Sequence, residues 1–320
     1  MGARTAVIDF RYHIVSLVAV FLALALGLFL GSTSLQSTVT HSLQKQADRV
    51  TTENQSLEGK NGQLGQELSA SQAFADAVEP YAVSDKLVDA GIAVVSAPGV
   101  DDGDRSALIH TLVLAGATVT ADVRLQSSYL DPNQDATLAQ LASQLAGTHP
   151  LPTGDGATQA GTELARALVT RPGARITSTR RIELILSTLT DAKMISVSGN
   201  APVRPADLVV VLVPVGSAPD GSASAVQQDN DLIGLARALR RGSSGLVVAA
   251  PTLQSGANNG VIAVIRADSS LTKTISTVDA DDTSVGRVAT VLALSAAPSG
   301  TTGRYGSTQK APLPTTSPVP

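Results

Sequence analysis

The sequence predicts an α/β protein held at a membrane: one N-terminal transmembrane helix, a coiled-coil helix, and a mainly parallel α/β domain with helices on both faces. Three observations support this prediction. An apolar run without a formal charge lies between Arg11 and Lys45. Apolar residues recur every seven positions from Leu43 to Leu64. After residue 90, short runs rich in β-branched residues alternate with stretches of helical periodicity, which is typical of α/β domains.

Residues 12–31 form the predicted transmembrane helix. A helix needs about 20 mostly apolar residues to cross the bilayer core, and this run has that length. A cleaved signal peptide is the alternative, but its apolar stretch is only about 7–15 residues long. The segment Gly31-Ser-Thr-Ser34 offers small residues without a clear Ala-x-Ala cleavage site. We therefore expect an uncleaved anchor.

The charges before the anchor predict its orientation. Arg4, Arg11 and the amino terminus outweigh Asp9. Because positively charged flanks stay on the cytoplasmic side, we expect residues 1–11 in the cytoplasm and the rest in the cell envelope. The chain contains no cysteine, so an exported domain must fold without disulfides. A net charge of −4 gives no electrostatic reason to expect binding to nucleic acid.

Residues 35–79 are predicted to form one helix with a coiled-coil seam. Four apolar residues are spaced by seven, and a poorer row follows each of them by four positions: Leu43, Val50, Leu57 and Leu64, then Ala47, Asn54, Asn61 and Leu68. Heptad seams join helices, and Asn at seam positions sets register and oligomer number. We expect a homodimer or higher homo-oligomer through Leu43, Val50, Leu57, Leu64 and Leu68.

An amphipathic helix that packs on its own domain is the alternative for this segment. Gly59, Gly62 and Gly65 weaken its middle, because each glycine costs about 1 kcal/mol relative to alanine in a helix. Pro80 is expected to end the helix, since proline lacks the backbone N–H that a helix interior requires.

Residues 88–296 are predicted to form the extracytoplasmic α/β domain. Its first part contains the strand 92–97, a helix that Asp104 can cap, and the strand 117–123. A strand–helix–strand unit of this length joins parallel strands. The middle part contains three predicted helices, at 132–145, 158–169 and 182–191.

The sheet pattern resumes near residue 194. Residues 208–213 are apolar throughout, which is typical of a central strand buried on both faces. We also expect strands at 194–197, 246–250, 261–266 and 275–278, and helices at 224–240 and 285–295. Residues 297–320 carry five prolines among Ser, Thr and Gly, so this tail is predicted to be disordered.

Ligands for a soft metal ion are sparse in the sequence. His13, His41, His110 and His149 are widely separated, Met occurs only at positions 1 and 194, and Cys is absent. Because Cu(I) prefers thiolate and thioether ligands, the residues themselves predict no copper site. The metal-binding residues, if the protein has any, are therefore unknown at this stage.

Two acidic loops are weak candidates for a binding site: Asp101 and Asp102 after the first strand, and Asp279, Asp281 and Asp282 before the last helix. Loops at the carboxyl ends of parallel strands commonly bind ligands, and carboxylates there could hold Mg²⁺ or Ca²⁺. The same residues also favour helix starts by capping and by offsetting the helix dipole. The sequence leaves both explanations open.

The motifs of common enzymes are missing. Ala97-Pro-Gly-Val-Asp-Asp-Gly103 follows a predicted strand but matches neither a dinucleotide-binding loop nor a P-loop. The chain contains no GxSxG nucleophile motif either. We therefore expect no catalytic residues, no certain cofactor and no enzyme activity.

Both ends of the chain resemble a known family. The start is Ile8-Asp-Phe-Arg-Tyr-His-Ile-Val-Ser, and the end combines Ile275-Ser-Thr-Val-Asp-Ala-Asp-Asp with Gly303-Arg-Tyr-Gly306. These segments are similar to those of the actinobacterial copper transport protein B (MctB) family. The order of anchor, coiled coil, α/β domain and tail is also similar, so the resemblance covers about the whole chain.

The resemblance implies a cell-envelope protein of copper transport or copper homeostasis, described for the family as an outer-membrane channel. Copper is implied by this resemblance only. Related actinobacterial proteins are described as partners of a membrane protein that controls cell-wall hydrolases during division. Two functions therefore remain open: a transport protein, or a non-catalytic adaptor whose stalk and α/β domain bind a membrane partner.

Overall fold

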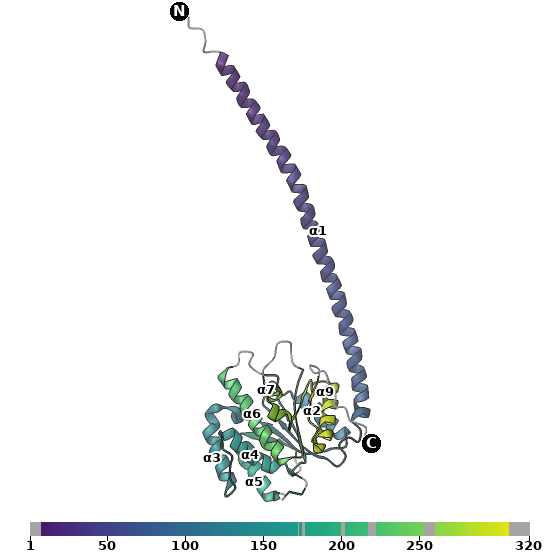
Figure 1. Ribbon diagram of the computed structural model, residues 1–320, viewed down its shortest axis with the longest axis vertical. Helices are drawn as coiled ribbons and strands as arrows, with labels where there is room; N and C mark the ends of the chain where they lie inside the picture. Colours follow the sequence, from purple (N-terminus) through teal and green to yellow (C-terminus); the bar gives the residue numbers. More distant parts are fainter. Residues whose placement is uncertain are drawn as a thin grey trace, which may run out of the picture. The chain divides into compact units, whose positions relative to one another are not determined.

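The computed structural model describes residues 8–171, 173–174, 177–199, 202–216, 222–252 and 260–306, without the side chains of residues 8–10 and 32–42. Contacts divide the chain into two compact units, Met1–Ala70 and Ser71–Pro320. We call the second unit the head. Figure 1 shows the long helix α1 and the α/β layers of the head.

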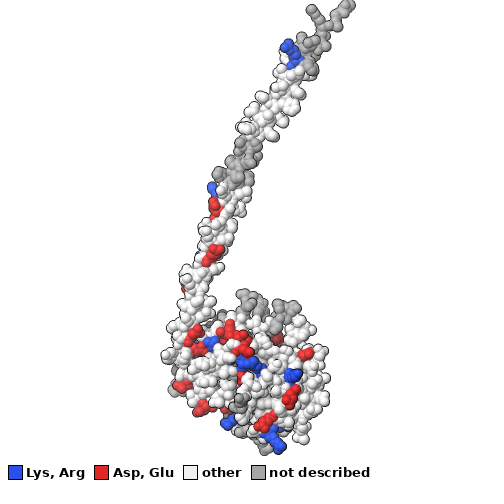
Figure 2. All heavy atoms as spheres, turned by 180° about the vertical axis from the view of Figure 1, so that it is seen from behind, with Lys and Arg blue, Asp and Glu red and all other residues white. Residues whose placement is uncertain are grey.

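Helix α1, Ile8–Val83, contains both the predicted anchor and the predicted stalk. The two segments form one continuous helix, in which the single proline is Pro80 near its end. Arg11–Gly31 is long and apolar enough to cross a membrane, and none of this stretch is buried within the protein. Figure 2 shows no charged side chain along it after Arg11 on the face that is drawn.

The prediction that Pro80 ends the helix is wrong by one turn. Helix α1 continues to Val83, and the backbone N–H of Ser84 still donates to the Pro80 carbonyl at 3.1 Å. Proline removes only the hydrogen bond that its own nitrogen would donate. One turn before the end of a helix, that loss does not prevent the final residues from packing on the head.

The head contains a seven-stranded sheet in the order β3-β2-β1-β4-β5-β6-β7, among the residues described. The strands are β1 Gly91–Ser96, β2 Thr118–Leu125, β3 Ile195–Ser198, β4 Leu208–Leu212, β5 Gly245–Ala250, β6 Ser276–Asp279 and β7 Arg304–Tyr305. Strand β3 pairs antiparallel with β2, and the other pairs are parallel. This confirms the predicted α/β class and mainly parallel sheet.

Helices cover both faces of the sheet (Figure 1). Ile92 and Val94 of β1 belong to the core under α2 and α9, whereas Ala93 and Val95 belong to the core on the opposite face. A strand buried on both faces carries apolar residues at every position, which explains its continuous apolar sequence. The helices are α2 Asp102–Leu114, α3 Asp135–Ala146, α4 Gly156–Leu168, α5 Thr179–Asp191, α6 Ala223–Gly242, α7 Val261–Ala267, α8 Ser269–Thr272 and α9 Ser284–Ala296. Short 3-10 turns lie at Ser127–Leu130, Pro132–Gln134 and Ala297–Ser299.

One predicted strand is a helix in the structure. Residues 261–266 form most of α7 and follow Gly260, whose φ is +112°. Val261, Ile262 and Ile265 are buried together, as the i, i+1, i+4 spacing of a helix face requires. A short apolar run has no periodicity that distinguishes a buried strand from a buried helix, and the strand predicted at 261–266 is wrong for this reason.

The head also extends beyond the predicted limits of 88–296. Residues 71–83 of α1 belong to it, and strand β7 adds Arg304 and Tyr305 to the edge of the sheet beside β6. The predicted disordered tail therefore starts too early, because residues 297–306 are ordered parts of the head. Residues 307–320 lie outside the described part of the chain.

Arg266 and Gly306 explain how this last strand is held. The guanidinium of Arg266 donates to Asp279 at 2.7 Å, to the Thr277 hydroxyl at 2.9 Å and to the Tyr305 carbonyl at 2.9 Å. Gly306 has φ of +122°, and a Cβ there would lie 2.1 Å from an Asp279 carboxylate oxygen. The Gly-Arg-Tyr-Gly segment thus contains the strand that docks on β6, and only glycine can occupy its last position.

Candidate functional site

The last turns of α1 contact the rest of the head through one helical face. Glu79 and Val83 recur at a spacing of four on this face and are 7% and 0% exposed. Phe74 and Tyr81 lie on the exposed side, at 71% and 83%. A buried carboxylate such as that of Glu79 requires a partner, because charge is costly to remove from water.

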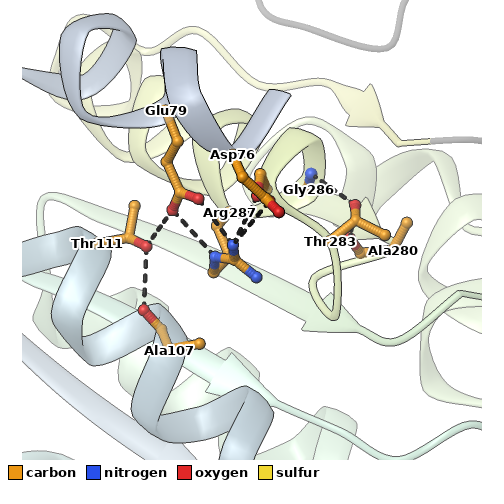
Figure 3. A network of polar contacts seen from close by, with 9 residues as sticks. Asp76, Glu79, Ala107, Thr111, Ala280, Thr283, Gly286 and Arg287 are labelled. Carbon is orange, nitrogen blue, oxygen red and sulfur yellow. Dashed lines mark hydrogen bonds and ion pairs between the residues drawn. The ribbon is translucent and has the colours of Figure 1, made fainter. Parts of the chain in front are cut away.

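Arg287 of α9 provides that partner (Figure 3). Its Nε and one Nη donate to the two carboxylate oxygens of Glu79 at 3.0 and 2.7 Å. The same Nη donates to the Ser284 hydroxyl at 2.7 Å, and the Thr111 hydroxyl of α2 donates to Glu79. Ser284 in turn donates to Asp76, which also lies on α1. The network therefore joins α1, α2 and α9 through hydrogen bonds in which both charges are paired.

The charges in this network stabilise each other. Burial alone would raise the pKa of Glu79, but the hydrogen bonds from Arg287, Thr111 and Ser284 outweigh it and lower this pKa. The hydrogen bond to Glu79 likewise raises the pKa of Arg287. A two-point Arg–carboxylate pair is among the stronger polar contacts and fixes geometry as well as charge. The network acts as a structural joint, which we call the Arg287 joint.

The two predicted acidic loops come close together at the starts of α2 and α9. The prediction that Asp104 caps this helix is wrong: α2 begins at Asp102, and Asp101 caps it by accepting from the backbone N–H groups of Gly103 at 2.7 Å and Asp104 at 3.1 Å. Burial, followed by the charges of Asp101 and Asp282, raises the pKa of Asp104. The helix starts thus bring both loops into one region of negative charge.

Asp281 is the most unusual member of this region. The residue is 4% exposed, and one of its carboxylate oxygens has no hydrogen-bond partner among the residues described. Burial, then the negative charges of Asp104 and Asp282, raises its pKa to about 7. Asp281 is therefore protonated in much of the folded population near neutral pH, and it adds less negative charge than the sequence suggests.

The remaining acidic candidates have structural partners. Asp102 pairs with Arg124 at 2.9 Å, and Asp279 pairs with Arg266 while it is fully buried. Asp282 accepts from the backbone N–H and the hydroxyl of Thr252 at 2.7 and 2.8 Å. No group of three or more His, Cys, Asp or Glu among the described residues is arranged to hold a metal ion. Capping therefore accounts for Asp101, whereas ion pairs account for Asp102 and Asp279 and the contact with Thr252 accounts for Asp282.

The predicted seam residues lie in α1, and their side chains are exposed. Leu43, Val50, Leu57, Leu64 and Leu68 are 60%, 50%, 56%, 61% and 59% exposed. A spacing of seven places the first four on one side of a helix. This row is an apolar surface that nothing within the single chain covers among the residues described.

The histidines remain apart from each other. His110 on α2 and His149 after α3 are exposed, and His13 lies in the apolar stretch of α1. The His41 side chain lies outside the described residues. These positions give no geometry for a shared metal site among the side chains that the structure describes.

The Arg287 joint is the feature that sequence analysis missed. An arginine between Val285 and Val288, within an apolar helix, indicates that a buried partner exists, but it does not identify it. Glu79 and Arg287 are 208 residues apart in the chain, so no local spacing connects them. The contact depends on the fold, which places the end of α1 beside α9.

Comparison with known proteins gives one consistent family. A family model described as "Copper transport outer membrane protein, MctB" matches residues 7–315. Proteins named "Copper transporter MctB" from Mycobacterium bovis and Mycobacterium tuberculosis are 30% identical over 315 residues, covering 93% of this chain and 96% of theirs. The Mycobacterium leprae protein of the same name is 30% identical over 318 residues, with the same coverage. The chain therefore belongs to the MctB family of membrane-associated copper transport proteins.

Proposed function

We propose that this protein is a non-catalytic, membrane-anchored component of copper transport in the cell envelope, and that it works as an oligomer joined through the seam of α1. The observation that carries the oligomer is the row Leu43, Val50, Leu57 and Leu64, which is 50–61% exposed on one side of the helix. Exposed apolar rows at heptad spacing are stabilised by a second helix.

The anchor also favours an assembly. The described part of each chain contributes one helix suited to crossing a membrane, Arg11–Gly31, and a single helix cannot enclose a path for an ion. Several copies, or this chain with another membrane protein, would be required. We place the amino terminus in the cytoplasm, because Arg4 and Arg11 precede the anchor.

Direct storage of Cu(I) is not part of this proposal. The chain has no Cys and two Met, whereas Cu(I) sites use thiolate and thioether ligands. We expect the purified protein to compete for Cu(I) no better than an unrelated control protein of similar size. Stoichiometric binding that withstands a Cu(I) chelator would instead establish direct copper handling by this chain.

The test uses a strain without the gene, complemented with wild type or with Leu57→Asp. A buried, unpaired charge at the centre of the seam should separate the helices. We expect the variant to reach the membrane at normal levels and to restore neither copper tolerance nor normal cellular copper content. Gln55→Asp adds the same charge two residues away and should complement fully. Full complementation by Leu57→Asp would refute a role for the oligomer.

A second candidate function is an adaptor that binds a membrane partner. Phe74 and Tyr81 favour it, because both aromatic rings lie exposed near the end of α1 and aromatic residues are enriched at energetically important contacts. Replacing both by serine should abolish crosslinks to such a partner and leave copper content unchanged. If copper content changes and crosslinks persist, the transport proposal is favoured.

A further inference from the structure

A cavity of about 340 Å³ lies where α4 and α6 end, on the head. Its lining includes Arg166 and Arg171 together with Arg241, which is exposed in the last turn of α6. The lining also includes the threonines Thr162, Thr170 and Thr177, and none of its described residues is Asp or Glu. The threonine hydroxyls donate to the backbone carbonyls of Thr158, Arg171 and Arg166, so the guanidinium groups are what makes the space suited to an anion.

These arginines differ in whether a carboxylate already pairs with their charge. Arg166 pairs with the fully buried Glu163 and also donates to the Pro150 carbonyl at 3.0 Å. Arg171 donates to the Ser243 carbonyl at 3.3 Å but has no carboxylate partner among the described residues. Arg241 makes no side-chain hydrogen bond or ion pair within the same set. Two positive charges at the cavity therefore lack a counter-charge.

Neighbouring Arg240 adds a third positive charge. It donates to the carbonyls of Thr274 at 2.7 Å and Ser243 at 3.0 Å, so its guanidinium hydrogen-bonds to the backbone rather than to a carboxylate. Burial, and then the charge of Arg171, lowers the pKa of Arg240, so the like charges are close enough to repel each other. The negative ends of α4 and α6 offset part of this charge. An anion in the cavity would offset the rest.

We propose that this cavity binds a phosphate group, with Arg171 and Arg241 as its principal ligands. Arginine matches phosphate because its planar fork donates two parallel hydrogen bonds to two oxygens. The cavity volume of about 340 Å³ admits a phosphate and a few further atoms of the ligand. The phosphate belongs either to a soluble phosphate ester or to the headgroup of a phospholipid.

The experiment measures binding to the full-length protein in neutral detergent micelles by calorimetric titration. One arm titrates sn-glycerol 3-phosphate, and the other titrates dihexanoylphosphatidic acid, which carries the same phosphate on acyl chains. Dihexanoylphosphatidylcholine is the zwitterionic lipid control. Saturable binding of the ester supports a soluble ligand, whereas saturable binding of the phosphatidic acid alone supports a lipid headgroup.

Charge-matched variants assign any binding to the cavity. We expect Arg171→Gln combined with Arg241→Gln to weaken binding at least about tenfold, since two charge-assisted contacts are lost. Arg204→Gln combined with Arg304→Gln removes two exposed arginines that form no ion pair with a described residue, and this variant should bind as wild type does. The lysine variants at 171 and 241 should bind with intermediate affinity. Absence of saturable binding in wild type, or equal loss in both glutamine variants, would overturn the proposal.

Discussion

Residues 43–68 and residues 71–83 lie on the same helix, yet their key side chains differ in burial: exposed in the first segment and buried in the second. In the first segment, the apolar seam residues are about half exposed or more, and nothing in the described chain covers them. In the second, Glu79 and Val83 are buried, and the carboxylate is held by Arg287 and Thr111. We expect the first segment to pack against a partner helix, whereas the second packs on the head of its own chain.

This difference shows what each kind of residue specifies. The repeating leucines specify a surface and a spacing, which many partner helices can satisfy. The Glu79–Arg287 pair specifies one contact, because removing either residue leaves the charge of the other buried without its partner and destabilises the fold. Mutations in the two segments should therefore have different consequences, association in one case and stability of the fold in the other.

Removing one member of the Arg287 joint should have the largest effect. Glu79→Ala removes the two-point partner of Arg287 and leaves only Asp76, at 4.0 Å, as a carboxylate beside it, so we expect the free energy of unfolding of the head to fall by about 3 kcal/mol. Thermal and denaturant unfolding of the full-length protein in detergent measure this. Replacing both residues, Glu79→Leu with Arg287→Met, should recover much of the loss. If Glu79→Ala unfolds within about 0.5 kcal/mol of wild type, the joint is not structural.

Placing a charge in the seam should have the next largest effect, on mass rather than on stability. Leu57→Asp is expected to convert the oligomer to a monomer, since an aspartate between two helices is desolvated without a partner. The melting temperature of the head should stay unchanged, because the head has its own core. Sedimentation in density-matched detergent gives the mass. Unfolding of the whole protein by this variant would instead show that residues 35–79 pack on the head.

Protonation of Asp281 should produce a smaller, pH-dependent effect. Burial raises the pKa of Asp281 to about 7, from 3.8 for an ordinary aspartate. Between these two pH values the folded state therefore binds more protons than the unfolded state. Stability is therefore lost as pH rises from about 4 to about 7, and the loss is complete above that range.

Asp281→Asn tests this dependence directly. At pH 8 the variant should be more stable than wild type by roughly 1–3 kcal/mol, and at pH 4 the two should be equal. Asp191, exposed at the end of α5, is the matched control for the same substitution. Equal stabilisation of Asp281→Asn at both pH values would exclude titration of Asp281 as the cause.

The sequence was sufficient for those parts of the fold that depend on local pattern. Helical periodicity identified residues 35–79 as part of a helix, and the continuous run at 208–213 identified the central strand β4; the seam from Leu43 to Leu64 stays a prediction. It failed at Val261–Ala267, where six apolar or small residues and Arg266 fit a strand or a buried helix equally well. It also failed at Arg304–Tyr305, because a two-residue strand carries no periodicity and is held by Arg266.

The polar features of the head could be predicted only in part. The sequence predicted an aspartate cap for α2 but named Asp104, because three aspartates at 101–104 all suit a helix start; the cap in the structure is Asp101. The partnership of Glu79 with Arg287, and the convergence of Arg171 with Arg241, depend on which helices the fold places together. Only the folded structure of the chain shows these contacts.

The most direct test of the central claim, that copies of this protein join through the seam, uses the natural absence of cysteine. Leu57→Cys introduces the only thiol in the chain, and a disulfide forms only if two copies bring their Cα atoms to about 4.4–6.8 Å. Gln55→Cys places the thiol on another side of α1 and serves as the control. In oxidised membranes we predict a disulfide-linked dimer for Leu57→Cys and a monomer for Gln55→Cys. No dimer at position 57, or equal dimer at both positions, would contradict the account.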